Sequence, residues 1–375
     1  MKILIATGGT GGHIMPAMAV ANALINKDFP APGTGGGMSG EARQGGGVEL
    51  LITTDSRGYD LVAKTAPHGA QIIRVWASGV GNRGLFGKLF ALSKLAISAI
   101  TLIVKFISRR NRPDRIVAFG GYSSVPAVLA GRILGVPTFL HEQNAAAGRA
   151  NALSARFATK ILTSFPETSG LPKKARVEFT GLPTRPDFVP TLMSSPGLTG
   201  GSRPLTLFIT GGSLGAKILM DVVPMAVALI PSAIKKNLMV VQQVDEAHHH
   251  EVEKFYAVTG IKHRLAPFFK DMAQEMKDAS LVIGRSGAST VVELMTIGRP
   301  AILVPLNINP DQAANARAFE KIGGGIVIEQ KNFTPKHLSK LLTELFSNPA
   351  RLEKMSLQAL TPNSATENIL HAILN

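Results

Sequence analysis

The feature that most constrains the fold is a layout that occurs twice: a short apolar strand, a Thr-Gly-Gly turn and a helix. Residues 1–25 read MKILIATGGTGGHIMPAMAVANALI, and residues 205–230 read LTLFITGGSLGAKILMDVVPMAVALI. Further short apolar strands follow each copy and alternate with helical patterns, which is typical of parallel sheets with right-handed crossovers. The repeat therefore predicts two similar doubly wound α/β domains. A length of 375 residues, too long for one ordinary core, agrees with this prediction.

A stretch rich in Pro, Gly, Ser and Thr at residues 180–204 predicts the linker between the two domains. We place the first domain at residues 1–184 and the second at 185–358. The glycine-rich stretch at residues 30–47 is low in complexity, and we expect it to be a loop without a function. The expected strands lie at residues 2–7, 48–54, 70–76, 114–119, 137–144 and 158–164 in the first domain, and at 205–210, 238–244, 281–284, 300–306 and 324–330 in the second.

The charge of the chain favours an anionic partner. Lys and Arg number 40 against 25 Asp and Glu, a formal net charge of +15. From Leu61 to Pro113 there is no acidic residue, and the basic residues of this span are mixed with Leu, Ile and Phe. Nucleic-acid surfaces combine basic residues with polar groups and stacking aromatics instead. The mixture therefore predicts contact with an anionic membrane surface and no nucleic acid.

The apolar segment at residues 89–107 is about long enough to span a bilayer. Lys94 and Lys105 interrupt it, and each charge at the centre of a span costs about 2.5–3.5 kcal/mol. We therefore expect a peripheral helix, part core and part membrane-facing. Four residues at its start should lie near the membrane: Leu85, Phe86, Lys88 and Phe90. The alternative is a helix that is wholly buried.

Three glycine turns follow expected strands, at Gly8–Gly12, Gly211–Gly215 and Gly284–Ala288. Such turns let the backbone and the N-terminus of the next helix approach phosphate groups. The alternative is that the glycines only permit tight turns. None has the spacing of a dinucleotide fingerprint, and the sequence contains no P-loop. Because the chain has no cysteine, disulfides and thiolate metal sites are excluded.

Two ionisable residues beside these turns are candidates for chemistry. His13 ends a glycine turn and begins a helix, whose positive dipole end keeps the imidazole neutral, as a general base requires. The alternative is a histidine that only bonds nearby backbone. Thr290 and Glu293 have the spacing of a capping box, so the pattern alone favours a helix cap for Glu293 over a ribose contact. Three consecutive histidines, His248 to His250, indicate a solvated helix face.

Seven motifs in order resemble one family of bacterial glycosyltransferases, the MurG family, from about residue 1 to about residue 330. They are GGTGGHI, GGYSSVPAVLAG, HEQNAAAGRAN, GLPTRPDF, TGGSLGAK, RSGASTVVELMTIGRPAILVP and DQAANARAFEKIG. The resemblance implies the GT-B architecture, two Rossmann-like domains facing across a cleft, with a last helix at about residues 359–375 that packs back on the first. It also implies inverting transfer of N-acetylglucosamine from UDP-N-acetylglucosamine to undecaprenyl-pyrophosphoryl-N-acetylmuramoyl-pentapeptide, which converts lipid I to lipid II.

The resemblance assigns the acceptor and the membrane to the first domain and the UDP-sugar to the second. It implies a peripheral protein on the cytoplasmic face of the plasma (inner) membrane, with cell-wall synthesis proteins as partners. We expect no cofactor. A metal is not required if helix dipoles and Arg185 stabilise the diphosphate, and no Asp-x-Asp motif lies near the candidate site. His13 would be the catalytic base, and Glu293 would take the ribose hydroxyls, which reverses the preference for a pure cap. The other substrate contacts would be Thr10, Gly11, Gly12, Asn144 and Gln312 at the donor sugar, Arg185 and Ser213 at the diphosphate, the backbone near Phe269 at the uracil, and Ala288, Ser289, Thr290, Val291 and Val292 beside the nucleotide.

The sequence departs from the family pattern at two places. Asp311 precedes Gln312 where the family usually has His or Gln, and VVQQVDE stands where a His-Gln-x-Gly pattern is common. Both departures concern the details of sugar recognition. Three other functions stay open: a different GT-B glycolipid glycosyltransferase, a UDP-N-acetylglucosamine epimerase, and a membrane-binding scaffold without activity.

Overall fold

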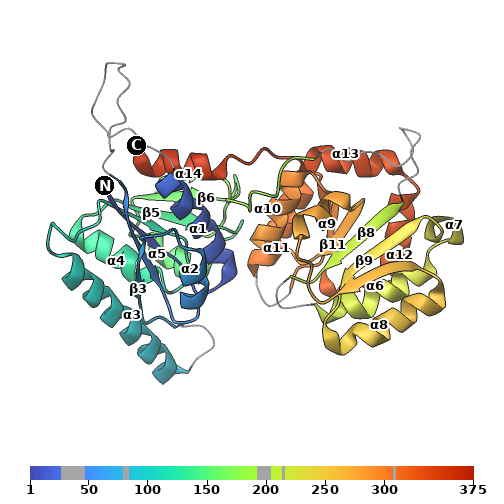
Figure 1. Ribbon diagram of the computed structural model, residues 1–375, viewed down its shortest axis with the longest axis horizontal. Helices are drawn as coiled ribbons and strands as arrows, with labels where there is room; N and C mark the ends of the chain where they lie inside the picture. Colours follow the sequence, from blue (N-terminus) through green and yellow to red (C-terminus); the bar gives the residue numbers. More distant parts are fainter. Residues whose placement is uncertain (27–46, 79–83, 192–203, 213–215, 307–309) are drawn as a thin grey trace, which may run out of the picture. The chain divides into compact units, whose positions relative to one another are not determined.

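The computed structural model describes residues 1–26, 47–78, 84–191, 204–212, 216–306 and 310–375. The glycine-rich residues 30–46 therefore lie outside the described part. The chain forms two compact units, each built on one parallel sheet (Figure 1). Unit 1 contains Met1–Thr184 and Ser364–Asn375, and unit 2 contains Arg185–Asn363. Each unit is described by itself.

Unit 1 has a seven-stranded sheet in the order β3-β2-β1-β4-β5-β6-β7. Its strands are β1 (Lys2–Ala6), β2 (Glu49–Thr54), β3 (Gln71–Arg74), β4 (Arg115–Ala118), β5 (Thr138–Glu142), β6 (Lys160–Thr163) and β7 (Val177–Phe179). Its helices are α1 (Gly11–Asn26), α2 (Tyr59–Thr65), α3 (Leu85–Phe106), α4 (Val125–Leu134), α5 (Arg149–Ser154) and α14 (Ala365–Leu374).

The central strand β1 shows why this sheet needs helices on both faces. Ile3 and Ile5 pack into a core with α1 and α14, whereas Leu4 and Ala6 point to the opposite face and pack with α3 and α4. Successive side chains of a strand alternate between faces, so a strand that is apolar throughout must be covered on both. The C-terminal helix α14 therefore belongs to the core of unit 1. The return to unit 1 begins at Ser364, five residues later than the expected start at about residue 359.

Unit 2 has a six-stranded sheet in the order β10-β9-β8-β11-β12-β13. Its strands are β8 (Leu205–Thr210), β9 (Leu238–Gln243), β10 (Lys262–Ala266), β11 (Leu281–Gly284), β12 (Ala301–Leu303) and β13 (Gly325–Val327). Its helices are α6 (Lys217–Leu229), α7 (Ser232–Lys235), α8 (Glu246–Thr259), α9 (Met272–Asp278), α10 (Ala288–Ile297), α11 (Pro310–Lys321), α12 (Pro335–Phe346) and α13 (Pro349–Ala359), with a 3₁₀ turn at Gln330–Asn332.

The strand orders confirm the expected doubly wound fold in both units. Strands β7 and β10 were not expected, and they lie at the edges of their sheets. In each unit the sheet grows in opposite directions from a central pair, β1 and β4 in unit 1 and β8 and β11 in unit 2. Ligands of doubly wound sheets bind at such switch points, outside the carboxyl ends of the strands. The turns that follow these four strands are therefore where a site is expected.

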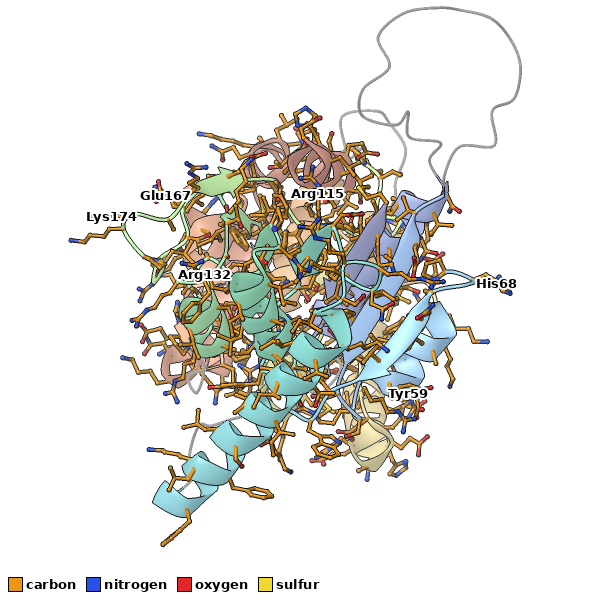
Figure 2. All side chains as sticks on the ribbon, turned by 90° about the vertical axis from the view of Figure 1, so that its left-hand side faces the viewer. Tyr59, His68, Arg115, Arg132, Glu167 and Lys174 are labelled. Atoms are coloured by element: carbon orange, nitrogen blue, oxygen red, sulfur yellow. The ribbon has the colours of Figure 1, made fainter. Side chains whose placement is uncertain are left out.

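Helix α3 is the one helix in the described residues that is long and apolar enough to cross a membrane, by length and composition only. Leu102 and Phe106 are buried in the core of unit 1, but Phe86 is 87% exposed and Phe90 58% exposed. In Figure 2 the first turns of α3 extend past the neighbouring elements of unit 1. The expected division of α3 into a core face and an exposed face is confirmed. The alternative, a helix that is wholly buried, is wrong. Contact with a membrane stays a prediction.

Candidate active site

The turn between β1 and α1 in unit 1 is shaped around the ring of His13. A Cβ atom on Gly8 would lie 2.7 Å from His13 Cδ2. Gly121, in the turn after β4, has a φ of +77°, and a Cβ there would lie 3.0 Å from Gly8 Cα. Two glycine backbones thus leave the space in which the imidazole lies. Thr10, Gly11 and Gly12, which the resemblance places at the donor sugar, are exposed beside it.

His13 lies in the first turn of α1 and bonds a side chain far away in the sequence. Its Nδ1 is 3.0 Å from Gln143 Oε1, at the end of β5. The alternative that His13 only bonds nearby backbone is therefore wrong. The half-buried position at a helix N-terminus next to a switch point is compatible with proton transfer.

The HEQN motif after β5 is organised by a buried carboxylate. Glu142 accepts hydrogen bonds from the backbone N–H and the Nδ2 of Asn144, from the Gly148 N–H and from Asn151 Nδ2, at 2.8–3.2 Å. Burial raises the pKa of Glu142, and these donors oppose that rise. Because four N–H groups converge on it, Glu142 fixes the loop that presents Asn144.

In unit 2 the capping-box prediction for Glu293 is wrong. Helix α10 begins at Ala288 with Gly287 as its N-cap, so Thr290 is already inside the helix and Glu293 falls in the second turn. The Glu293 side chain is only 14% exposed and lies 3.6 Å from Arg185 Nη2. Burial raises its pKa to about 7, while Arg185 opposes this rise and Asp187 adds to it. A carboxyl group with so perturbed a pKa is typical of a functional site.

Arg185 is held beside Glu293 by the segment that follows it. Its guanidinium lies over the ring of Phe188, 4.7 Å from the centroid. The buried Arg299 donates to the carbonyl groups of Thr191 and Lys277, and Lys277 Nζ donates to the Asp187 carbonyl at 2.6 Å. Burial lowers the pKa of Arg299 to about 10. Hydrogen bonds thus join the first residues of unit 2 to the segments before and after α10.

The remaining residues expected at the nucleotide differ in exposure. Ala288, Ser289 and Thr290 are half-buried at the start of α10, whereas the side chains of Val291 and Val292 are buried in the core. Val291 and Val292 could therefore meet a nucleotide only through their backbone. Phe269 is likewise buried, with its ring edge-on to Phe208 at 5.5 Å. The expected contact of the backbone near Phe269 with the uracil stays a prediction. Ser213 lies outside the described residues.

Gln312 lies in the first turn of α11 and bonds residues that follow β11 and β12. Its Oε1 accepts from the Leu306 N–H at 2.9 Å, and its carbonyl accepts from Ser286 Oγ at 2.8 Å. Asp311, the departure from the family pattern, accepts from the Gln312 N–H. Gln312 therefore joins the turns after β11 and β12, which places it on the same edge of the sheet as α10.

The structure thus gathers two groups of residues. Unit 1 brings Thr10 to His13 together with the HEQN motif, and unit 2 brings Arg185 together with Glu293. Sequence reasoning did not single out Gln143, although it stands next to Asn144 in HEQN. Its side chain bonds His13. The histidines 248–250 lie on α8, where His248 bonds the N-cap Asp245. Among the described residues, no three His, Asp or Glu side chains gather in an arrangement that could hold a metal.

Two family models match the chain, the glycosyltransferase family 28 N-terminal domain over residues 3–163 and the C-terminal domain over residues 206–370. The chain is 41% identical over 355 residues to the UDP-N-acetylglucosamine–N-acetylmuramyl-(pentapeptide) pyrophosphoryl-undecaprenol N-acetylglucosamine transferase of Methylobacterium radiotolerans, which covers 93% of this chain and 90% of the relative. The transferase of the same name from Rhodospirillum rubrum is 38% identical over 351 residues, 93% of this chain and 84% of the relative.

Among solved structures, the crystal structure of Acinetobacter baumannii MurG matches with a TM-score of 0.78 and 30% identity, covering 100% of this chain and 99% of that one. The chain belongs to the MurG family of glycosyltransferases. A UDP-N-acetylglucosamine 2-epimerase of Listeria monocytogenes has a TM-score of 0.63 at 15% identity over 100% of this chain and 95% of that chain, which shows a shared fold alone. Membership in the MurG family confirms the resemblance of the seven motifs, and the roles of the individual site residues stay predictions.

Proposed function

We propose that this protein transfers N-acetylglucosamine from UDP-N-acetylglucosamine to the muramoyl 4-hydroxyl of undecaprenyl-pyrophosphoryl-N-acetylmuramoyl-pentapeptide, with inversion at the anomeric carbon. The observation that carries the proposal is the 41% identity to a transferase of this name over 93% of the chain. The matched region spans both units, because 93% of the chain is longer than either unit alone. The product of the reaction is lipid II, and UDP is released.

We propose that unit 1 binds the acceptor and carries the base. His13 takes the proton of the acceptor hydroxyl as that oxygen attacks the anomeric carbon from the side opposite to UDP. The glycine turn supports this role because a Cβ on Gly11 or Gly12, next to His13, would meet nothing within 4 Å, which leaves open space for substrate atoms. A positioned base typically contributes about 10²–10⁴-fold to the rate. Asn144, presented by the Glu142 network, supplies an amide for the donor sugar, as do the exposed N–H groups near Thr10 to Gly12.

Unit 2 binds the donor nucleotide in this proposal. The Glu293 carboxylate accepts hydrogen bonds from the ribose hydroxyls, and the Arg185 guanidinium stabilises the diphosphate. As the bond from the anomeric carbon to the diphosphate oxygen breaks, its electron pair goes to UDP. Arg185 and the N–H groups at the start of α10 then face a growing negative charge, which is where fixed donors lower a barrier most. The proximity of Arg185 to Glu293 supports the assignment of both residues to one ligand.

We further propose that unit 1 docks on an anionic membrane surface through α3. The outer face of this helix exposes Phe86, Leu89 and Phe90 together with Lys88. Full burial of one such apolar side chain stabilises by about 1.5–3 kcal/mol, and each Lys near an anionic surface adds about 1 kcal/mol. Both contributions act on the same turns of α3. The helix stays peripheral because its opposite face, including Phe106, belongs to the core of unit 1.

The proposed function is tested by supplying the full-length protein with radiolabelled UDP-N-acetylglucosamine and lipid I in detergent. Formation of lipid II together with an equal amount of UDP is the expected result. A second arm offers a glycolipid acceptor without the peptide, and a third omits the acceptor. Transfer to the second acceptor alone would indicate another glycolipid transferase, and conversion of the sugar nucleotide without acceptor would indicate an epimerase. Either outcome, or no turnover in any arm, would overturn the proposal.

A further inference from the structure

We propose that Gln143 is a positioning residue that holds His13 in the tautomer with its proton on Nδ1, so that the lone pair on Nε2 accepts the proton of the acceptor hydroxyl. This inference rests on the proposed function of His13 as the base. Gln143 is 3% exposed and follows β5 directly. Main-chain carbonyl groups determine the orientation of its amide, because a carbonyl oxygen can act only as a hydrogen-bond acceptor.

The amide nitrogen of Gln143 faces two main-chain oxygens. Its Nε2 donates to the Phe119 carbonyl at 2.8 Å and to the His141 carbonyl at 3.3 Å. A carbonyl oxygen can only accept, so the NH₂ end of the amide must lie on this side. The other end of the amide, Oε1, therefore points toward His13.

His141 supports the same orientation from a third direction. Its Nε2 lies 2.9 Å from the Gly181 carbonyl and so carries a proton that it donates to that oxygen. Burial lowers the pKa of His141 to about 4, although the hydrogen bond to the Gly181 carbonyl opposes this fall, so the ring is neutral at pH 7. Its Nδ1 is then an acceptor, and it faces Gln143 Nε2 at 3.4 Å. All three neighbours of the Gln143 nitrogen are acceptors.

The consequence for His13 follows from its 3.0 Å contact with Gln143 Oε1. An amide oxygen can only accept, so His13 Nδ1 must donate and carry the proton. In the neutral ring the lone pair is then on Nε2. An amide makes this choice without adding a charge, whereas a carboxylate at the same place would also favour the imidazolium form. Gln143 thus selects the tautomer without favouring the imidazolium form.

Among the residues that the structure describes, few charged groups face this network. The turns on either side of the ring contribute Gly8 and Gly121, which do not titrate. On β5 the titratable groups are His141, which is neutral, and Glu142, whose oxygens are bound by Asn144, Gly148 and Asn151. At the end of β2, the carboxylate of Asp55 is paired with Arg57. We therefore assign any change in the pH dependence of a Gln143 variant to the new side chain at position 143.

Two variants separate the roles of the amide. Gln143→Met keeps the length of the side chain but removes the acceptor for Nδ1–H. Gln143→Glu keeps an acceptor and adds a charge. The matched control is Gln242→Met in unit 2, which also removes a buried amide, one that accepts from the Tyr256 hydroxyl at 2.6 Å. We expect the control to change stability without changing the pH profile.

The tautomer is read directly from ¹⁵N spectra of the full-length protein labelled at histidine, with the His13 signals assigned by their loss in His13→Ala. We expect the Nδ1–H form in the wild type and in Gln143→Glu, and a mixture of tautomers in Gln143→Met. For Gln143→Met, kcat should fall about tenfold or more, with both KM values within about threefold. For Gln143→Glu, the acid limb of the pH–rate profile should move up by about one pH unit, because the carboxylate stabilises the imidazolium.

The spectra and the rates distinguish two failures. If wild-type His13 carries its proton on Nε2, or if Gln143→Met keeps both the Nδ1–H form and the wild-type kcat, the inference about Gln143 is overturned. If instead the wild type shows the Nδ1–H form but His13→Ala keeps its turnover, the proposed base is wrong, and Gln143 then positions a residue that takes no part in the reaction.

Discussion

Replacing Glu293 by Gln is expected to weaken donor binding, remove its pH dependence and stabilise the free protein at the same time. These effects share one cause. The carboxyl group is buried in unit 2, and its burial raises the pKa from an ordinary 4.5 to about 7 despite Arg185 at 3.6 Å. The ionised form is therefore disfavoured in the free protein, although the proposed contact with ribose hydroxyls needs it.

The size of the effect on stability follows from the pKa. A folded-state pKa raised above the unfolded value means that stability is fully present below pH 4.5 and is lost as the pH rises through 7. The shift corresponds to about 3 kcal/mol above pH 7. A Gln side chain does not ionise. We therefore expect Glu293→Gln to be more stable than the wild type at pH 8 by up to about 3 kcal/mol, and the two to be similar near pH 4.5.

The effect on binding follows from the same number. With a pKa of about 7, roughly a tenth of Glu293 is ionised at pH 6 and roughly nine tenths at pH 8. The affinity for UDP-N-acetylglucosamine, whose phosphates do not titrate in this range, should then rise about tenfold between these pH values. In Glu293→Gln the affinity should not depend on pH, and at pH 8 it should be about tenfold weaker or more, since a lost charged hydrogen bond costs about 1–3 kcal/mol.

Calorimetry with UDP-N-acetylglucosamine at pH 6, 7 and 8 measures the affinities, and urea denaturation at the same pH values measures the stabilities. The matched control is Glu275→Gln on α9, since the Glu275 side chain is similarly shielded, at 16% exposed, and is paired with Arg264. This control should bind the donor as the wild type does at every pH. If Glu293→Gln keeps the wild-type affinity at pH 8, Glu293 does not bind the ribose. A loss of affinity that keeps its pH dependence would assign that dependence to another group.

The other predictions concern the base, the membrane face and one turn. His13→Ala should lower turnover at saturating substrates by at least about a hundredfold, while calorimetry finds donor affinity within a few-fold; near-normal turnover would remove His13 from the mechanism. The double variant Phe86→Ser, Phe90→Ser should weaken binding to anionic vesicles about tenfold or more, and the remaining binding should stay sensitive to salt. Its thermal stability should not change, because both side chains are exposed. Unchanged sedimentation with vesicles would show that this face of α3 does not contact the membrane. Gly9→Ala should lower the free energy of unfolding by about 1–3 kcal/mol, because its Cβ would lie 2.3 Å from the buried Asp55 Oδ1. Gly11→Ala is the control, since a Cβ there meets nothing within 4 Å. Equal free energies of unfolding for the two variants in urea denaturation would contradict this prediction.

The sequence predicts the fold well where burial imposes a pattern. Strands in the middle of a parallel sheet are covered on both faces and so read as continuous apolar runs, as β1 does. Strands β7 and β10 lie at sheet edges, and β10 reads KHRLA, with charged residues that face solvent. An edge strand of this kind has neither an apolar run nor a strict alternation. Its place is determined by pairing with β9, which no local pattern records.

The site is only partly predictable, for a related reason. The capping-box spacing at Thr290 and Glu293 was a valid local signal, but α10 begins earlier, at Ala288, so the helix does not need that cap. The burial of Glu293 comes from tertiary packing, and its neighbour Arg185 is distant in the sequence. Gln143 bonds His13 across 130 positions of the chain. Local spacing could mark the turns and helices but not these partners.

The two ionisable groups of the proposed reaction illustrate this difference between position and protonation. His13 follows a glycine turn after β1, and Glu293 lies on the helix that follows β11, so both stand near the carboxyl edge of a central strand, where sequence patterns place them correctly. Their protonation depends on contacts that the patterns do not contain. The burial of Glu293 opposes its ionisation, so its carboxylate gains most from a ligand that donates hydrogen bonds. His13 has an uncharged amide as a partner, which selects a tautomer without favouring the imidazolium. In each unit the fold supplies the position of the ionisable group, and contacts with residues distant in the sequence determine its protonation.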